Sequence, residues 1–257
     1  MLSILKRIHQ IMSRSGINLL AFGHSVISIP YYLQTMMVYH RQSVGGKFPL
    51  QFQNLNPCLG DRHSDAGIGD RQYFYQDLWA ARKIQQRRPE RHVDVGSRID
   101  GFIAHLLTFM PVEVVDVRPL GDVVDGLKFV QDDATEMRGF APDSLVSLSC
   151  LHAAEHFGLG RYGDPVSTDA PFRLMQSLQR VLKPGGNLYF SVPVGHERVE
   201  FNAHRVFAPQ TVVDGFPGLA LQSFSYVDDR GAFHENALIS GASQLSLGCG
   251  LFEFSKT

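Results

Sequence analysis

The densest group of reactive side chains in the sequence lies in the segment LHAAEHFGLGRYGDP, residues 151–165. It contains His152, Glu155 and His156 close together. Histidine changes its charge near neutral pH, so it suits a general base that takes the proton from a hydroxyl group. His152 follows directly on a predicted strand and is our first candidate for that role, ahead of Glu155, His156 and His204. Hydrogen-bonded core positions would suit the same histidines, and the sequence leaves both roles open.

A second chemical interpretation of the same residues is a zinc site. His152-x-x-Glu155-His156 matches the H-x-x-E-H motif, which on a helix supplies two histidine ligands and a general-base glutamate. That motif belongs within a long helix, whereas here it follows a buried strand. A zinc-dependent hydrolase is therefore our third hypothesis, and we assign no metal ligand.

Candidate substrate-binding residues lie on both sides of this cluster. Arg161, Tyr162 and Asp164 end the same segment, and Asn202 and Arg205 belong to PVGHERVEFNAHRVFAP, residues 193–209. The second segment leaves the carboxyl end of a predicted strand, where loops commonly carry binding residues. These side chains suit hydroxyl or phosphate groups of a substrate, and a solvated polar loop is the alternative.

Acidic residues end three successive predicted strands. Asp94 and Gly96 lie in HVDVGSRIDGF, residues 92–102, where glycine permits a tight turn before a helix N-terminus. Asp116 comes 20 residues after Gly96, a spacing typical of a carboxylate that accepts from ribose hydroxyls. Asp132 and Asp133 end the next strand, where a carboxylate can accept from an adenine amine. Any one of these aspartates could instead cap a helix.

The elements that position these residues alternate between strands and helices. Such alternation predicts an α/β fold with a parallel, doubly wound sheet. We expect the last two strands to pair antiparallel, and the nine residues 118–126 leave no room for a full crossover helix. Lys183–Gly186 has the chemistry of a helix stop. The predicted strands are 92–96, 112–117, 127–131, 144–149, 187–193, 219–227 and 245–254, and the predicted helices are 72–86, 102–110 and 172–182.

Composition divides the chain into a basic arm, residues 1–69, and a body, residues 70–257. The chain has 257 residues and a formal net charge of -1, which excludes a broadly basic nucleic-acid binder. Residues 1–60 have no Asp or Glu but five Lys or Arg. Their uncharged stretch is interrupted by Pro30 and polar residues, so we expect a helical lid or oligomer contact, or a peripheral hold on an anionic membrane, instead of a membrane span. Three widely separated cysteines predict a cytoplasmic protein without disulfides.

The run VDVGSRIDGF, VEVVDV, FVQDDA, APDSLVSLSCLHAAEH and LQRVLKPGGNLYFSVP resembles class I S-adenosylmethionine-dependent methyltransferases. Together, QYFYQDLWAARKI, HVDVGSRIDGF, EHFGLGRYGDP and FNAHRVF resemble an uncharacterised bacterial family, a domain of unknown function associated with surface-polysaccharide biosynthesis. The resemblance implies a Rossmann-like seven-stranded, mostly parallel sheet with strand order 3-2-1-4-5-7-6. It also implies S-adenosylmethionine as cofactor and O-methylation of a sugar or glycan precursor, free or carrier-linked.

The resemblance also implies roles for individual residues. Gly96 and the turn 97–101, with Ser97, Arg98 and Gly101, would face the methionine moiety beside Asp94. Asp116 would hold the ribose, and Asp132, Asp133 and Ala134 would lie at the adenine. The chain departs from the D-x-G-x-G-x-G pattern, since Arg98 and Asp100 replace the second and third glycines. That departure supports the alternative hypothesis, a methyltransferase-fold binding protein in polysaccharide assembly that transfers no methyl group.

Overall fold

A computed structural model of the chain describes residues 19–46, 48–60, 69–121 and 124–257. The chain divides into two compact units, Met1–Gly67 and Ile68–Thr257. Of the five basic residues that make the arm positive, only Arg41 lies within the described residues.

The first unit is built around one long helix, α2 (Leu19–Ser43), which confirms the expected helical N-terminal segment. The helix contains Pro30 and exposes large apolar side chains, among them Phe22 and Ile27. A single 3-10 turn, η1 (Phe52–Asn54), follows it. Within the described ranges, no helix has the length and apolar character needed to cross a membrane.

The second unit contains the predicted α/β sheet. Its strands are β1 (Val93–Val95), β2 (Val112–Asp116), β3 (Leu127–Gln131), β4 (Leu145–Leu151), β5 (Leu182–Val194), β8 (Leu219–Val227), β9 (Phe233–His234) and β10 (Gly248–Lys256). They pair in the order β3-β2-β1-β4-β5-β10-β8-β9. The first five are parallel, and β10 runs antiparallel to both β5 and β8. With β8 and β10 as sixth and seventh strands, the order 3-2-1-4-5-7-6 is confirmed, and the short β9 extends the edge.

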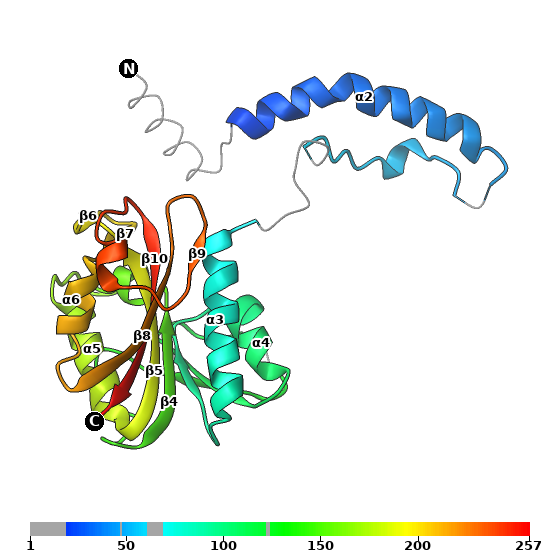
Figure 1. Cartoon of the computed structure of the whole chain (residues 1–257). Helices are drawn as coiled ribbons and strands as arrows, with labels where there is room; N and C mark the ends of the chain where they lie inside the picture. Colours follow the sequence, from blue (N-terminus) through cyan, green and yellow to red (C-terminus); the bar gives the residue numbers. More distant parts are fainter. Residues whose placement is uncertain (1–18, 47, 61–68, 122–123) are drawn as a thin grey trace. The chain divides into compact units, whose positions relative to one another are not determined.

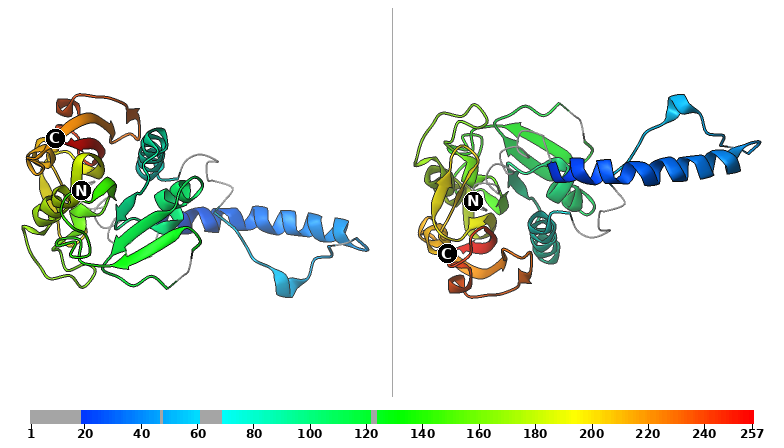
Figure 2. Two further views of the ribbon diagram at one scale, coloured as in Figure 1. Left: turned by 90° about the horizontal axis from the view of Figure 1, so that it is seen from below. Right: turned by 90° about the horizontal axis from the view of Figure 1, so that it is seen from above.

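Helices cover both faces of this sheet (Figure 1). They are α3 (Arg71–Arg87), η3 (Ile99–Ile103) and α4 (Ala104–Leu107) on one face, and α5 (Ala170–Val181) and α6 (Pro209–Asp214) on the other. Two further short turns are η4 (Ala154–His156) and η5 (Ile239–Ala242). Figure 2 shows α3 nearly end-on beside the sheet. Each face has its own apolar core, one centred on side chains of α3 and α4 and the other on α5 and α6.

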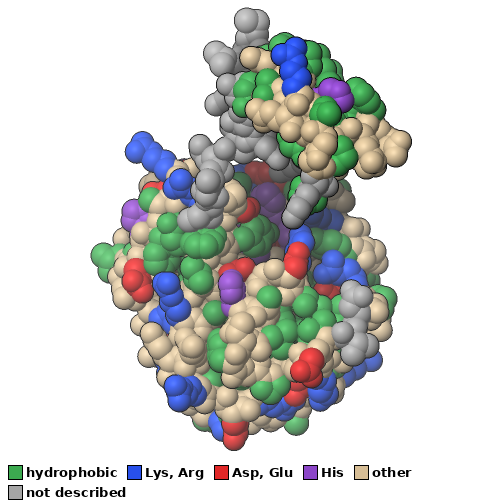
Figure 3. Space-filling view, turned by 90° about the vertical axis from the view of Figure 1, so that its right-hand side faces the viewer, with side chains coloured by type: hydrophobic (Ala, Val, Ile, Leu, Met, Phe, Trp, Pro, Cys, Tyr) green, Lys and Arg blue, Asp and Glu red, His purple; other side chains and the backbone are tan. Residues whose placement is uncertain are grey.

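The N-terminal half of α3 lies at the carboxyl ends of the parallel strands (Figure 1). Asp70 caps the helix by accepting from the backbone N–H groups of Gln72 and Tyr73. At the other end, the buried carboxylate of Glu253 accepts from Lys83 Nζ and Arg87 Nη2, each at 2.7 Å. These two anchors fix which α3 side chains reach the strand ends. The surface seen in Figure 3, on the side of α3 and α4, carries apolar patches separated by charges of both signs.

Two predicted elements differ from the structure. In place of the single helix expected over 102–110, the structure has the π turn η3 followed by α4, which ends at Leu107. The π turn contains Gly101, whose backbone angles are not helical (φ -117°, ψ -110°). Lys183–Gly186 is more than a helix stop: the β4–β5 register passes from Leu145↔Leu182 to Ser147↔Asn187, so these residues bulge from the ladder. In the described part of 118–126 the backbone forms turns and no helix.

Candidate functional site

The sheet brings the predicted catalytic and cofactor segments to one edge. The loops after β1, β2, β3, β4 and β5 all leave the carboxyl ends of parallel strands, which lie at the end of the sheet drawn with β6 and β7 (Figure 1). The hairpin formed by β6 (Arg198–Glu200) and β7 (His204–Val206) follows β5 and lies over the loop that begins at His152. Ligands of such sheets bind at this edge.

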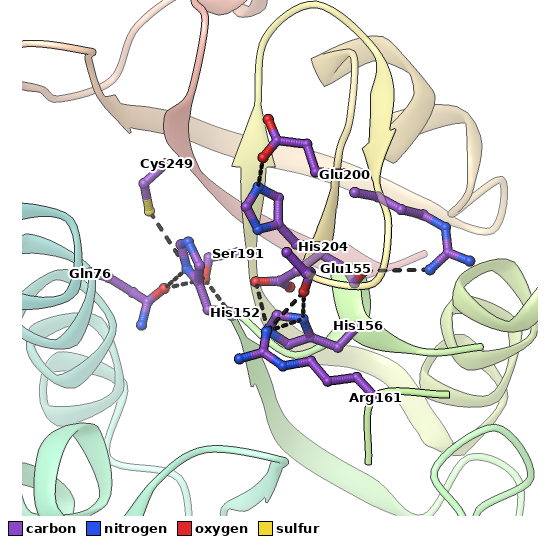
Figure 4. A network of polar contacts seen from close by, with 11 residues as sticks. Gln76, His152, Glu155, His156, Arg161, Ser191, Glu200, His204 and Cys249 are labelled. Carbon is purple, nitrogen blue, oxygen red and sulfur yellow. Dashed lines mark hydrogen bonds and ion pairs between the residues drawn. The ribbon is translucent and has the colours of Figure 1, made fainter. Parts of the chain in front are cut away.

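His152 is held in one orientation by the residues around its ring. Its Nδ1 lies within hydrogen-bond distance of Gln76 Oε1, which also accepts from the Ser191 hydroxyl (Figure 4). Gln76 Nε2 donates to Asp77 at 3.1 Å, so Oε1 is the atom that faces the imidazole. Because Oε1 can only accept, Nδ1 carries the proton and Nε2 carries the lone pair. None of the described residues hydrogen-bonds to Nε2.

The surroundings of His152 keep it neutral. Burial, together with the nearby His156 and His204, lowers its pKa to about 3. Tyr73 packs on the ring at 5.1 Å between centroids. His152 also has a left-handed backbone conformation (φ 48°), and its N–H donates to the backbone oxygen of Ser191 at 3.0 Å. Its imidazole is therefore fixed, uncharged and able to accept a proton at Nε2.

Glu155 and His156 form a second pair beside His152. Glu155 is 1% exposed, and burial raises its pKa to about 8, so the carboxyl group is protonated at neutral pH. Its Oε1 lies 3.7 Å from His156 Nε2, and its Oε2 has no hydrogen-bond partner among the described residues. His156 Nδ1 donates to Ala203 O at 2.8 Å, and burial lowers the His156 pKa to about 4. Figure 4 shows the carboxyl group between His156 and His204.

This arrangement does not fit the zinc hypothesis. The H-x-x-E-H segment forms only the three-residue turn Ala154–His156, and His152 precedes it in a left-handed conformation. The two histidines therefore do not share one helix face, and His152 is directed to Gln76. No group of three His, Cys, Asp or Glu side chains in the described part of the chain converges as metal ligands would.

The predicted substrate-binding residues are used in different ways. Asp164 accepts from the N–H groups of Gly158 and Tyr162 and so shapes its own loop. Arg205 donates to the backbone oxygens of Phe157 and Ser167 at 2.5 and 3.3 Å, so its guanidinium stabilises the fold. Asn202 is exposed between the two hairpin strands.

Of the predicted residues, Arg161, Tyr162 and His204 remain to be placed. Tyr162 lies between two guanidinium groups, with Arg118 at 4.8 Å and Arg161 at 5.2 Å from its ring centroid. His204 Nε2 lies 3.6 Å from Glu200 Oε2, its cross-strand partner in the β6–β7 hairpin.

The loop after β1 has the tight turn that its sequence predicts. Gly96 has a φ of 78°, and a Cβ atom there would lie 3.0 Å from the Ala153 side chain, so glycine is favoured by both the backbone conformation and the close contact. Asp94 is fully buried and accepts from the N–H and hydroxyl of Ser97, each at 3.0 Å, and from the hydroxyl of Ser149. Burial raises the Asp94 pKa to about 6. Asp94 therefore holds the turn in place and offers no free oxygen edge to a ligand.

The two residues that replace glycines in this loop pair with each other. Arg98 and Asp100 form an ion pair at 2.6 Å, with side chains 83% and 68% exposed. They point into solvent and do not fill the turn. At Gly101 a Cβ atom would lie 2.9 Å from Asp77 Oδ2, so a carboxylate from α3 lies directly against the loop.

The carboxylates after β2 and β3 already have partners. Asp116 binds Arg118 through both oxygens, at 2.6 Å to Nη2 and 3.0 Å to Nε. Asp132 accepts from the N–H groups of Asp133 and Gly139. Asp133 accepts from Thr135 through Oδ1 and has no described partner at Oδ2, while the adjacent Ala134 is buried.

Sequence reasoning missed four residues that organise this edge. Gln76 and Ser191 hold the imidazole of His152 in place. Asp77 lies against the loop after β1, and Arg118 binds the carboxylate of Asp116. The adjacent polar pair Gln76-Asp77 within an otherwise apolar helical pattern was the one available signal.

Two surface hollows lie elsewhere, one of about 560 Å³ beside Lys183 and one of about 320 Å³ beside the β6–β7 hairpin.

Comparisons with known proteins agree with this architecture. Residues 128–231 match a family model described as "Caenorhabditis protein of unknown function, DUF268". No curated protein matches the chain. The structure of the [4+2]-cyclase SpnF has a TM-score of 0.52 and 12% identity, over 91% of this chain and 96% of that one. The Burkholderia thailandensis 1,6-didemethyltoxoflavin-N1-methyltransferase, solved with 1,6-didemethyltoxoflavin and S-adenosylhomocysteine, has a TM-score of 0.50 and 16% identity, over 76% and 93%.

These likenesses and the strand order define the class of fold. The body of the chain has the Rossmann-like methyltransferase fold, with a mostly parallel sheet and a helical segment before it. That fold carries more than one chemistry, since one of the two similar structures is a cyclase.

Proposed function

We propose that the chain is an S-adenosylmethionine-dependent methyltransferase that O-methylates a sugar or glycan precursor. The observation that carries the proposal is His152. Its ring is fixed at the carboxyl edge of the sheet by Gln76 and Ser191, with the lone pair at Nε2 and no described partner there. A general base needs this combination of fixed position and free lone pair.

The residues on the β1 side fit the cofactor. Gly96 provides a tight turn in which a Cβ atom would crowd the Ala153 side chain, and the Asp77 carboxylate lies against the following loop. A cationic amino group and sulfonium are favoured there. Asp133 has a free Oδ2 for an adenine amine, next to the buried Ala134. The toxoflavin methyltransferase, similar in fold, was solved with S-adenosylhomocysteine.

Asp116 suits a ribose only after a rearrangement. Arg118 now donates to both carboxylate oxygens of Asp116, and the Arg118 side chain is half-exposed. Ribose hydroxyls would replace the guanidinium, which is half-exposed and has room to turn toward solvent. The ion pair is a competitor that the cofactor must displace.

His152 acts on the acceptor in this proposal. When bound, S-adenosylmethionine supplies an electrophilic methyl group. From the sequence we expected a histidine that titrates near neutral pH, the range in which a general base is most efficient. A hydroxyl that is being methylated becomes strongly acidic as its new bond forms, so a weaker base can also take its proton. His152, whose pKa is lowered to about 3, accepts the proton at Nε2 while Gln76 holds Nδ1–H. The sugar acceptor is drawn from the sequence resemblance and from the exposed polar side chains beside the site.

Calorimetric titration with S-adenosylmethionine and S-adenosylhomocysteine tests the proposal. Wild type should bind both, and Asp77→Asn and Asp116→Asn should each weaken binding about tenfold, equivalent to about 1.4 kcal/mol. Asp214→Asn, a change in an exposed carboxylate at the end of α6, serves as control and should bind like wild type. No binding at millimolar ligand by the folded protein would overturn the proposal.

A binding protein without transfer activity is the second candidate. The ion pair between Asp116 and Arg118 favours it, because it closes the ribose position in the free protein. The cyclase among the similar structures shows that the fold does not by itself imply methyl transfer. The same titration separates the two candidates, since this one requires no affinity for S-adenosylmethionine.

A further inference from the structure

Arg161 is an exposed arginine of the acceptor side that forms no ion pair with a carboxylate among the described residues. Its Nη1 donates to Ala203 O at 2.8 Å, and its guanidinium lies 5.2 Å from the Tyr162 ring. The side chain is exposed on the loop after β4, held by the carbonyl and by the aromatic ring.

The neighbouring arginines differ from Arg161 in this respect. Arg98, Arg118 and Arg198 are bound to Asp100, Asp116 and Glu200, respectively. Arg205 donates to backbone oxygens and is half-buried. Arg161 is therefore a cation available to a ligand.

The buried acid and histidines of the same segment carry no charge that opposes Arg161 at neutral pH. Glu155, which interacts electrostatically with Arg161, is buried with its pKa raised to about 8, so it is protonated. His152 and His156 are neutral because burial lowers their pKa values to about 3 and about 4. The acceptor side thus has a positive charge at Arg161, while the Asp77 carboxylate lies against the loop after β1.

We propose, on the basis of the function proposed above, that the acceptor carries an oxyanion, either a phosphate or a carboxylate, and that Arg161 binds it. Arginine presents five N–H donors in a planar fork that matches both groups, and Ala203 engages only Nη1. Figure 4 shows the guanidinium extending past His156 toward the side on which His152 lies. An acceptor bound there by its anionic group would present a hydroxyl toward His152.

Three sugars that differ in one group test this assignment: glucose, glucose 1-phosphate and glucuronate. Calorimetry is done on the full chain, with and without S-adenosylhomocysteine. Wild type should bind at least one of the two anions about tenfold more tightly than glucose. Arg161→Gln should abolish that preference, and Arg161→Lys should restore part of it. Arg173→Gln removes an equal charge from the exposed face of α5 and should keep the preference.

Tighter binding of glucose 1-phosphate than of glucuronate would indicate a phosphate on the acceptor, and the reverse order would indicate a carboxylate. Equal affinity for all three sugars, no binding at millimolar concentration, or an unchanged preference in Arg161→Gln would overturn the inference. Titrating the same samples with S-adenosylmethionine separates it from the proposed function. Cofactor binding without anion binding refutes Arg161 alone, and anion binding through Arg161 without cofactor binding refutes methyl transfer alone.

Discussion

Glu155→Gln should gain stability relative to wild type as the pH rises. Burial raises the pKa of Glu155 from 4.5 to about 8. Between these values the folded state binds a proton that the unfolded state has released, so a higher pH favours unfolding. Glutamine has nearly the same shape and no proton to lose. The variant is therefore free of a pH-dependent penalty that wild type carries.

The size of the effect follows from the two pKa values. While the folded carboxyl group stays protonated and the unfolded one is ionised, wild type loses about 1.4 kcal/mol of stability per pH unit relative to the variant. From about pH 5.5 to about pH 7 the difference in free energy of unfolding should grow by about 2 kcal/mol. The buried histidines titrate in both proteins, so their contributions cancel in the comparison.

Denaturant unfolding followed by the fluorescence of Trp79 measures this difference. Trp79 is the single tryptophan of the chain and is buried in α3. Glu113→Gln is the matched control. The Arg91 guanidinium lowers the Glu113 pKa, so Glu113 is ionised in both the folded and the unfolded state over this pH interval. Its effect should stay constant there and shrink only in acid. A constant difference for Glu155→Gln would show that Glu155 is ionised in the folded protein and refute the reasoning.

Three further changes test the site. Gly96→Ala should destabilise the folded protein by about 1–2 kcal/mol because of its positive φ, and further because the new Cβ atom meets Ala153. Gly185→Ala is the control, since Gly185 has a similar φ but open space around it, and denaturant midpoints should show a smaller loss there. Gln76→Ala should release the fixed tautomer of His152, visible as averaged ¹⁵N chemical shifts of its ring; an unchanged Nδ1–H signal would contradict the assignment. Arg118→Gln should tighten S-adenosylhomocysteine binding about two- to fivefold in calorimetry, because a surface ion pair worth about 0.3–1 kcal/mol no longer competes; weaker binding would show that Arg118 assists the ligand.

The strands were predictable because their pattern is local. The runs LKFVQ and LALQSFSYV coincide with β3 and β8 as observed. The antiparallel pairing of the last two long strands was predicted because a connection formed by a loop over 228–244 leaves no room for a full crossover helix. The break in the helix after β1 was not predictable in this way. It occurs at Gly101, where a carboxylate from α3 approaches the backbone, and that approach depends on tertiary packing.

The location of the site was easier to predict than the use of each residue. Parallel strands end at a common edge, so Asp94, Asp116 and Asp133 were expected to gather there. Whether each carboxylate faces a ligand depends on hydrogen bonds that residue type does not specify. Asp94 accepts from two serines, and Asp116 accepts from Arg118, two positions further along the chain. The partner of His152 is a glutamine 76 positions away in the sequence.

The two sides of the proposed site carry opposite charge, and this affects how two ligands would bind. The Asp77 carboxylate lies against the loop after β1, where Asp100 is paired with Arg98, and Arg161 lies on the loop after β4, which also carries the neutral His152 and His156. A cationic methyl donor and an anionic acceptor would each meet the favourable sign and attract one another. Coupling between two bound ligands is reciprocal, so each raises the affinity of the other by the same factor. Loss of the methyl group leaves an uncharged thioether, which weakens this attraction at the moment when the products must leave.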